Sequence, residues 1–64
     1  MNQTLLATQI ANRVIKDVTK ELGTTKSAAF IQHGLHFSWW KDDDAIYVEV
    51  RNENGELLEV RQPL

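Results

Sequence analysis

Hydrophobic and polar residues alternate along the second half of the chain, from Leu35 to Gln62. This alternation is typical of strands in a sheet with one buried face, because successive side chains point to opposite sides of the sheet. We therefore predict three strands, over residues 35–40, 45–51 and 56–62, in an antiparallel meander. The residues expected on the buried face are Leu35, Phe37, Trp39, Ile46, Val48, Val50, Leu58 and Val60.

The length of the first turn determines whether the apolar side chains of the first two strands lie on the same face of the sheet. A register shift of one residue would move every side chain of a strand to the opposite face. Residues 41–44 include three aspartates, which form turns readily through side-chain hydrogen bonds to the backbone. A four-residue loop here pairs Trp39 with Ile46 and Phe37 with Val48, so that the apolar side chains share one face.

The second turn contains Asn54-Gly55, a pair that is typical of two-residue hairpin loops. A two-residue loop would place apolar residues opposite polar ones. A three-residue loop over Glu53–Gly55 instead pairs Val50 with Leu58 and puts the glycine in the left-handed conformation, which it adopts without steric cost. We therefore predict the longer loop.

Residues 4–22 carry apolar side chains at the spacing of an amphipathic helix, in which positions three or four apart share a face. Gly23 follows, and glycine is common where a helix ends in a left-handed residue. We predict that this helix lies across the apolar face of the sheet. The apolar stripe consists of Leu6, Ile10, Val14, Val18 and Leu22, widened by Ala7, Ala11 and Ile15.

The segment between the helix and the first strand allows two interpretations. One of the threonines before Lys26 could cap a short second helix over residues 25–33, with a following glycine to end it. Alternatively, residues 29–32 form an extra strand that turns at His33-Gly34. We favour the short helix, because Lys-Ser-Ala-Ala is a poor start for a strand.

Length and composition narrow the class of protein. The 64 residues predict one α+β domain, residues 1–64, because a second core would not fit. The chain has no cysteine, so disulfides and thiolate zinc sites are excluded. No stretch has the pattern of a signal peptide or a membrane span, and we expect a cytoplasmic protein. The net charge of −2 argues against general binding to nucleic acid or anionic membranes.

Two patterns invite a metal-site interpretation, and neither predicts one. His33 and His36 flank Gly34, which would interrupt a helix that could align them as ligands. The aspartates at 42–44 are crowded into a tight turn, whereas calcium takes about six to eight oxygens, as in longer loops. We expect surface histidines and a solvated turn, with no metal and no cofactor.

The sequence offers little for catalysis. It has no cysteine nucleophile, no glycine-rich phosphate loop and no serine in a nucleophile elbow. The predicted register places Glu49 opposite both Glu59 and His36, which we interpret as mild repulsion relieved by the histidine. We therefore predict that the protein is not an enzyme and has no catalytic residues.

The polar face of the sheet is the best candidate for a functional surface. Aromatic residues beside arginines are characteristic of binding hot spots, and Tyr47 next to Arg61 allows a cation–π contact. We predict a small interaction or regulatory protein that uses this face or an unpaired sheet edge, with a protein partner such as a second copy of itself in a homodimer. The predicted interaction surface consists of Trp40, Tyr47, Leu57, Arg51, Arg61 and His36.

An alternative function is DNA binding by a winged-helix module. In this alternative, residues 21–27 form the turn between two helices, and the last hairpin serves as the wing. Phosphate contacts would fall to Lys20, Lys26, Arg51 and Arg61. The net negative charge of the chain argues against DNA binding, and so does the hairpin tip, which has no positive charge.

Overall fold

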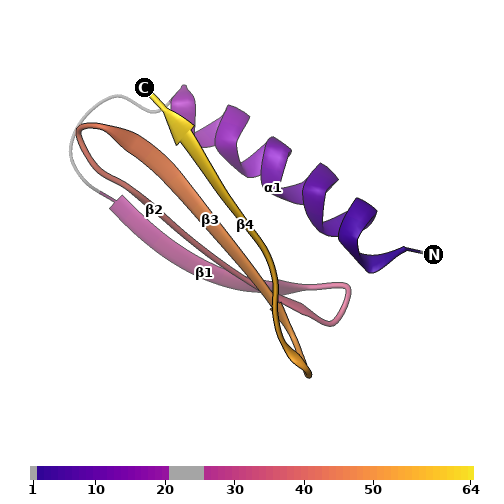
Figure 1. Ribbon diagram of the computed structural model, residues 1–64. Coiled ribbons are helices and arrows are strands. Elements are labelled where there is room, and N and C mark those ends of the chain that lie inside the picture. Colours follow the sequence, from indigo (N-terminus) through magenta and orange to yellow (C-terminus); the bar gives the residue numbers. More distant parts are fainter. Residues whose placement is uncertain (1, 21–25) are drawn as a thin grey trace.

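The computed structural model describes residues 2–20 and 26–64, which form one helix and a four-stranded antiparallel sheet (Figure 1). The strands lie side by side in sequence order. The α+β class and the three strands of the meander are confirmed, but the sheet has one strand more than predicted. In chain order the elements are α1 (Gln3–Thr19), β1 (Lys26–Gln32), β2 (Leu35–Lys41), β3 (Ala45–Asn52) and β4 (Gly55–Pro63).

The additional strand is β1, which replaces the predicted short helix over residues 25–33. The prediction was wrong, and the described residues contain no second helix. The strand pairs with β2 along its whole length, and the ring of Phe30 stacks on that of Phe37 with centroids 4.9 Å apart. This pairing outweighs the weak strand propensity of the Lys-Ser-Ala-Ala sequence, because strand preference depends mainly on packing against neighbours. The threonines proposed as caps lie outside the described residues.

The turn between β1 and β2 consists of His33 and Gly34, as the alternative interpretation of this segment required. Both residues have positive φ angles, 54° and 73°. A two-residue type I′ turn needs this conformation at both positions, and its twist matches that of the strands that it joins. Gln32 and Leu35 therefore lie directly opposite each other on either side of the turn.

Helix α1 begins after Asn2, whose side-chain oxygen accepts hydrogen bonds from the backbone N–H groups of Thr4 and Leu5, at 2.9 and 3.4 Å. The helix ends at Thr19, and the predicted end at residues 22–23 lies outside the described residues. Within the described ranges, no helix combines the length and apolarity that crossing a membrane requires. The described part of the predicted stripe is confirmed: Ala7, Ile10, Ala11 and Val18 are buried, and Leu6, Val14 and Ile15 pack against the core.

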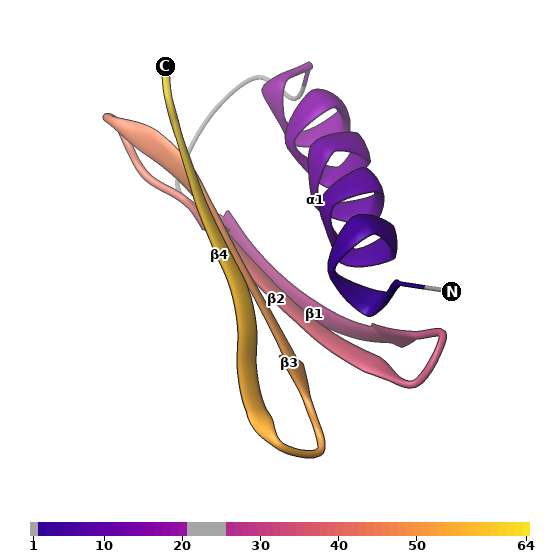
Figure 2. The same cartoon turned by 45° about the vertical axis from the view of Figure 1, so that its right-hand side comes forward.

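The core lies between α1 and the inner face of the sheet, as Figure 2 shows from the side. Every residue predicted for this face is at least partly buried, because side chains that alternate along the strands all point toward the helix. The largest fully buried side chains are Phe37, Leu35, Ile46, Val48 and Val50, while Trp39, Leu58 and Val60 are partly buried around them.

The pairing of β2 with β3 differs from the prediction by two residues, with Trp39 opposite Val48. The turn is tighter than expected because Asp42 Oδ1 accepts hydrogen bonds from the backbone N–H groups of Asp44 and Ala45, at 2.8 and 2.9 Å. A shift of two residues keeps each side chain on its predicted face. The inner face is therefore correct although the cross-strand partners are not.

The pairing of β3 with β4 agrees with the prediction, with Val50 opposite Leu58. Gly55 has a positive φ of 120°, which glycine adopts more readily than other residues. It pairs with Asn52, so the loop itself is residues 53–54. The predicted three-residue loop was therefore wrong, and the predicted pairing of Val50 with Leu58 is kept by a bulge further along β4.

That bulge is a register shift between Val50 and Arg51 that brings Arg51 opposite Glu56. Leu57 is left between two successive pairs and packs against the hydrophobic core. The prediction that Leu57 lies on the outer face was therefore wrong. A bulge adds one residue to one strand only, so it changes the alternation of side chains at that point.

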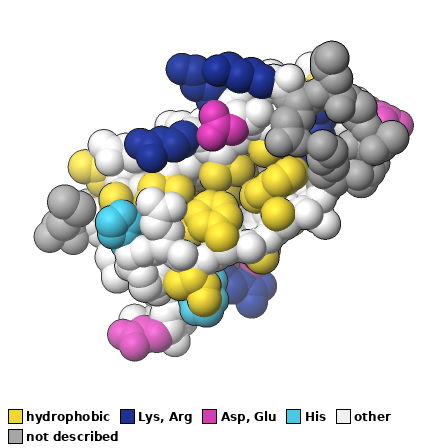
Figure 3. All heavy atoms as spheres, turned by 180° about the vertical axis from the view of Figure 1, so that it is seen from behind, with side chains coloured by type: hydrophobic (Ala, Val, Ile, Leu, Met, Phe, Trp, Pro, Cys, Tyr) yellow, Lys and Arg dark blue, Asp and Glu magenta, His cyan; other side chains and the backbone are white. Residues whose placement is uncertain are grey.

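Helix α1 covers β2, β3 and β4 but does not reach β1. On the inner face of β1, Ala28 is exposed and Phe30 only half-buried, while Ala29 and Ile31 are exposed on the outer face. Figure 3 shows hydrophobic side chains gathered in an exposed patch on the rear of the molecule as Figure 1 draws it. Of the described strands, β1 thus has open faces on both sides and a free edge.

Candidate functional site

The outer face of the sheet, the side turned away from α1, carries an aromatic pair. Trp40 of β2 lies directly opposite Tyr47 of β3, and their rings stack with centroids 5.1 Å apart and planes inclined by 14°. Arg61 of β4 lies opposite Tyr47, with its guanidinium carbon 5.9 Å from the ring centroid, a cation–π distance. Because Tyr47 contacts Trp40 on one neighbouring strand and Arg61 on the other, the rotation of these side chains is restricted.

Strand β1 extends this surface with two apolar side chains, Ala29 and Ile31. Ile31 is 67% exposed and Trp40 37% exposed. A shallow hollow of about 470 Å³ opens beside Ile31, and its lining includes His36 and Ser38. We call the apolar part of this surface, Ala29, Ile31, Trp40 and Tyr47, the outer patch.

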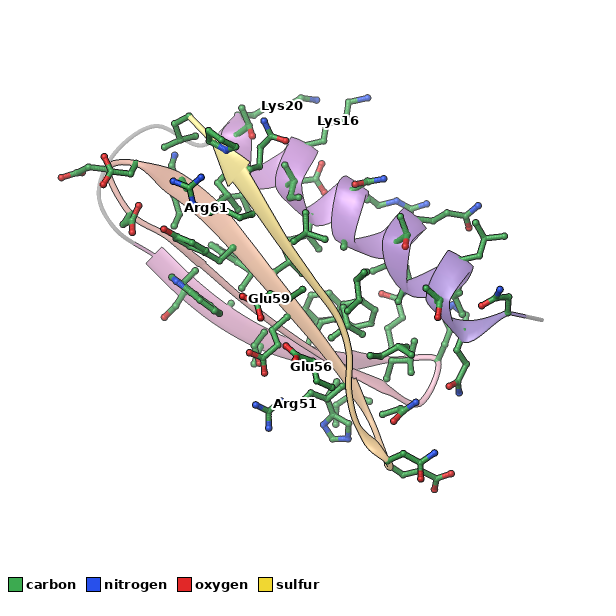
Figure 4. The ribbon with its side chains drawn as sticks, viewed as in Figure 1. Lys16, Lys20, Arg51, Glu56, Glu59 and Arg61 are labelled. Carbon is green, nitrogen blue, oxygen red and sulfur yellow. The ribbon has the colours of Figure 1, made fainter. Side chains whose placement is uncertain are left out.

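The outer face also carries three carboxylates, Glu49, Glu56 and Glu59, whose oxygens lie within 4.8 Å of one another. The pairing of Glu49 with Glu59 was predicted, and the bulge adds Glu56. The hydrogen bond that a protonated Glu56 carboxyl donates to the side chain of Glu59 raises the pKa of Glu56 above its ordinary value, and partial desolvation and the negative charges of Glu59 and Glu49 act in the same direction. Figure 4 shows Glu56 and Glu59 close together on the side of the sheet away from α1.

Arg51 balances part of this negative charge, because its Nε donates a hydrogen bond to Glu49 Oε1. Carboxylates at such spacing are the ligand type that hard divalent cations take. Here they lie on the outer face of the sheet, and one of them is already paired with a guanidinium group. We therefore assign the three carboxylates no metal, and interpret them as part of the charge balance of this face.

The remaining predicted residues divide between these two groups. His36 lies on the outer face opposite Arg51, not opposite Glu49, because the first turn of the meander is tighter than predicted. Arg51, rather than His36, therefore relieves the repulsion between the glutamates. His33 lies in the β1–β2 turn.

The residues proposed for DNA contacts do not gather on one surface. Figure 4 shows Lys20 at the end of α1 and Arg51 at the far end of the sheet. Arg61 stacks on Tyr47, and Lys26 is the first residue of β1. A winged-helix module needs a second helix to enter the major groove, and the described residues have none. The second helix that this alternative requires is replaced by strand β1, while residues 21–25 of the proposed turn lie outside the described residues.

Ala29, Ile31 and Glu56 are the outer-face residues that sequence reasoning missed. Residues 28–31 are all apolar, and such a run is typical of a strand with apolar surroundings on both faces. Together with the turn signal at His33-Gly34, this run could have identified β1. Nothing in the sequence signals the bulge that moves Glu56 to the outer face.

Comparison of the chain with models of known protein families, with curated proteins and with solved structures gives no match.

Proposed function

We propose that this protein is a non-enzymatic binding module that contacts another polypeptide through the outer face of its sheet. The observation that carries the proposal is the outer patch. Its residues come from three adjacent strands and share one face of the sheet, and α1 covers only the opposite face. Isolated apolar residues are ordinary on protein surfaces, whereas apolar side chains gathered on one face are characteristic of interaction sites.

The composition of the patch supports a protein partner. Trp40 and Tyr47 supply large contact area, and their mutual stacking means that little side-chain freedom remains to be lost on binding. His36 and Ser38, which line the neighbouring hollow, and Arg61 offer hydrogen bonds around the apolar centre. An apolar centre with a polar rim is the usual anatomy of a protein–protein interface.

Site-specific photo-crosslinking in cells that produce the protein tests this function. A photoreactive phenylalanine analogue is placed at position 31 or 40, and at the control positions Gln9 and Arg13, which are exposed on α1. We expect discrete polypeptide adducts from positions 31 and 40 and none from the controls. The adduct at position 31 should be lost when Trp40→Glu is combined with it, because both positions would belong to one interface.

Two results would contradict the proposal. Adducts of equal yield from α1 and from the outer patch would indicate chance collisions. An absence of adducts at positions 31 and 40 would mean that this surface has no polypeptide partner in those cells.

A further inference from the structure

The two edges of the sheet differ in how open they are to another strand. The edge strand β4 contains Pro63, which cannot donate a backbone hydrogen bond, a bulge at Leu57, and the charged residues Glu56, Glu59 and Arg61. These are features by which proteins prevent edge strands from pairing. Strand β1 has one charged residue, Lys26 at its start, and the rest of the strand, residues 27–32, has no proline, no charge and no bulge.

From this difference we infer that two copies of the chain pair through β1, antiparallel about Ala29, and join their sheets into one. The inference rests on the proposed function, because it names the polypeptide that the module binds and the edge beside the outer patch as the contact. The partner is a second copy because the sequence of β1 is complementary to itself.

The direction of the backbone groups supports this pairing. In an antiparallel pair, residues alternate between those that hydrogen-bond to the neighbouring strand and those that do not. The residues that flank a two-residue turn form a hydrogen-bonded pair, which here is Gln32 with Leu35. Counting back from Gln32, the backbone groups of Ser27, Ala29 and Ile31 point to the free edge, so these residues are available to a second strand.

The register of the pairing follows from which backbone groups of β1 point to the free edge and from the face of the sheet on which each side chain lies. Only an even shift keeps inner residues opposite inner ones. With Ala29 on the two-fold axis, every residue of β1 has a partner, and Lys26 of each copy is paired with Gln32 of the other copy rather than with the other lysine. A shift by two residues would leave the end of β1 unpaired and put Phe30 opposite the partner's Phe30.

Side-chain size is complementary in the same register. On the inner face Ala28 lies opposite the partner's Phe30, and on the outer face Ser27 lies opposite the partner's Ile31. Each bulky side chain thus meets a small one. Ala28, which is exposed in one copy, gains the aromatic ring of the partner's Phe30 as an apolar neighbour across the axis. Pairing also adds buried surface to a chain of 64 residues, a size at which one copy alone buries only about 60% of the surface of its unfolded chain.

The experiment measures the mass of the purified full chain by light scattering coupled to size exclusion, between about 1 μM and about 1 mM, which spans weak to moderate association. We expect the mass to rise with concentration from 7.4 kDa toward twice that value. Ile31→Lys puts a charge at the paired edge and should weaken association at least about tenfold. Leu5→Lys is the matched control, since Leu5 is 57% exposed on α1, and it should leave association unchanged.

A second variant tests backbone pairing directly. Ala29→Pro removes an N–H that points to the free edge, so β1 can still pair with β2, but the symmetric pairing loses both of its central hydrogen bonds. Circular dichroism should show a folded chain, and light scattering should show that it stays monomeric. In a mixture of labelled and unlabelled chains, an isotope-filtered nuclear Overhauser contact between the Hα of Ala28 and that of the partner's Phe30 would identify the register.

The outcomes separate this inference from the proposed function. A purified chain that remains monomeric at about 1 mM overturns pairing through β1. If positions 31 and 40 then still crosslink to a different polypeptide in cells, the module binds a foreign partner and the proposed function stands. A dimer that survives both Ile31→Lys and Ala29→Pro would mean that the copies meet elsewhere, which also overturns the inference.

Discussion

Carboxylate oxygens of Glu56 and Glu59 lie within 4.8 Å of each other on the outer face, although both side chains are acidic. The bulge in β4 brings them together, because it sets Glu56 opposite Arg51 while Glu59 remains opposite Glu49. A hydrogen bond between two carboxyl groups requires one of them to hold a proton. The folded chain therefore favours the protonated form of Glu56, and the charge of the outer face depends on pH.

The raised pKa of Glu56 predicts how stability changes with pH. Its ordinary value is 4.5 and the folded value is higher, so its stabilising effect is complete below the ordinary value and is lost as pH rises through the folded value. Glu56→Gln keeps a neutral side chain at every pH. We expect thermal unfolding to show that the wild-type chain loses stability relative to Glu56→Gln as pH rises toward neutrality.

Glu53→Gln is the control for this prediction, because it removes one negative charge at the exposed tip of the same hairpin. It should change the pH profile far less than Glu56→Gln does. Equal profiles for the two variants would mean that net charge, rather than the contact with Glu59, causes the effect.

Asp42 predicts a pH response of the opposite sign. Hydrogen bonds from the backbone N–H groups of Asp44 and Ala45 lower its pKa below the ordinary value of 3.8. Its contribution to stability is therefore present above that ordinary value and lost as pH falls through the folded value. Asp42→Ala should lower the unfolding temperature at neutral pH, with a smaller difference in strong acid. Asp43→Ala, exposed in the same turn, should have little effect at either pH.

The β1–β2 turn predicts a stabilising substitution. His33 has a φ of 54°, and the left-handed conformation costs most L-residues roughly 1–2 kcal/mol, but asparagine less. His33→Asn creates Asn-Gly, the preferred sequence of a type I′ turn. We expect it to raise the free energy of unfolding by about 0.5–1 kcal/mol in urea denaturation.

The converse substitution in that turn is Gly34→Ala. A Cβ at this position would meet no atom within 4 Å, so any loss of stability comes from the backbone conformation alone, with φ at 73°. We expect a loss of about 1 kcal/mol. A neutral Gly34→Ala would contradict the left-handed conformation assigned to the turn.

Truncation of the core should separate buried from exposed leucines. Leu35 is fully buried beneath α1, whereas Leu5 is 57% exposed. Leu35→Ala should cost about 2–5 kcal/mol, which is a large share of the stability of so small a domain. Leu5→Ala should stay within about 0.5 kcal/mol of the wild-type chain. Urea denaturation at low protein concentration measures both without a contribution from association.

The alternation of side chains was sufficient to predict the faces of the sheet. Phe37 and Val48 are buried as expected, even though they are not cross-strand partners, because a register shift of two residues leaves every side chain on its own face. The spacing of Ile10 and Val18 likewise predicted the buried side of α1. These are local periodicities, and they depend on backbone geometry that the sequence reveals directly.

Tertiary structure decided the rest. The Lys-Ser-Ala-Ala sequence of residues 26–29 has weak strand propensity, and it joins β1 because β2 supplies a strand edge and an aromatic partner for Phe30. The bulge likewise has no local signal: it turns Leu57 into the core and leaves Glu56 beside Glu59. In both places the conformation depends on contacts between residues that the chain brings together only when it folds, so local patterns could not predict the outer patch in full.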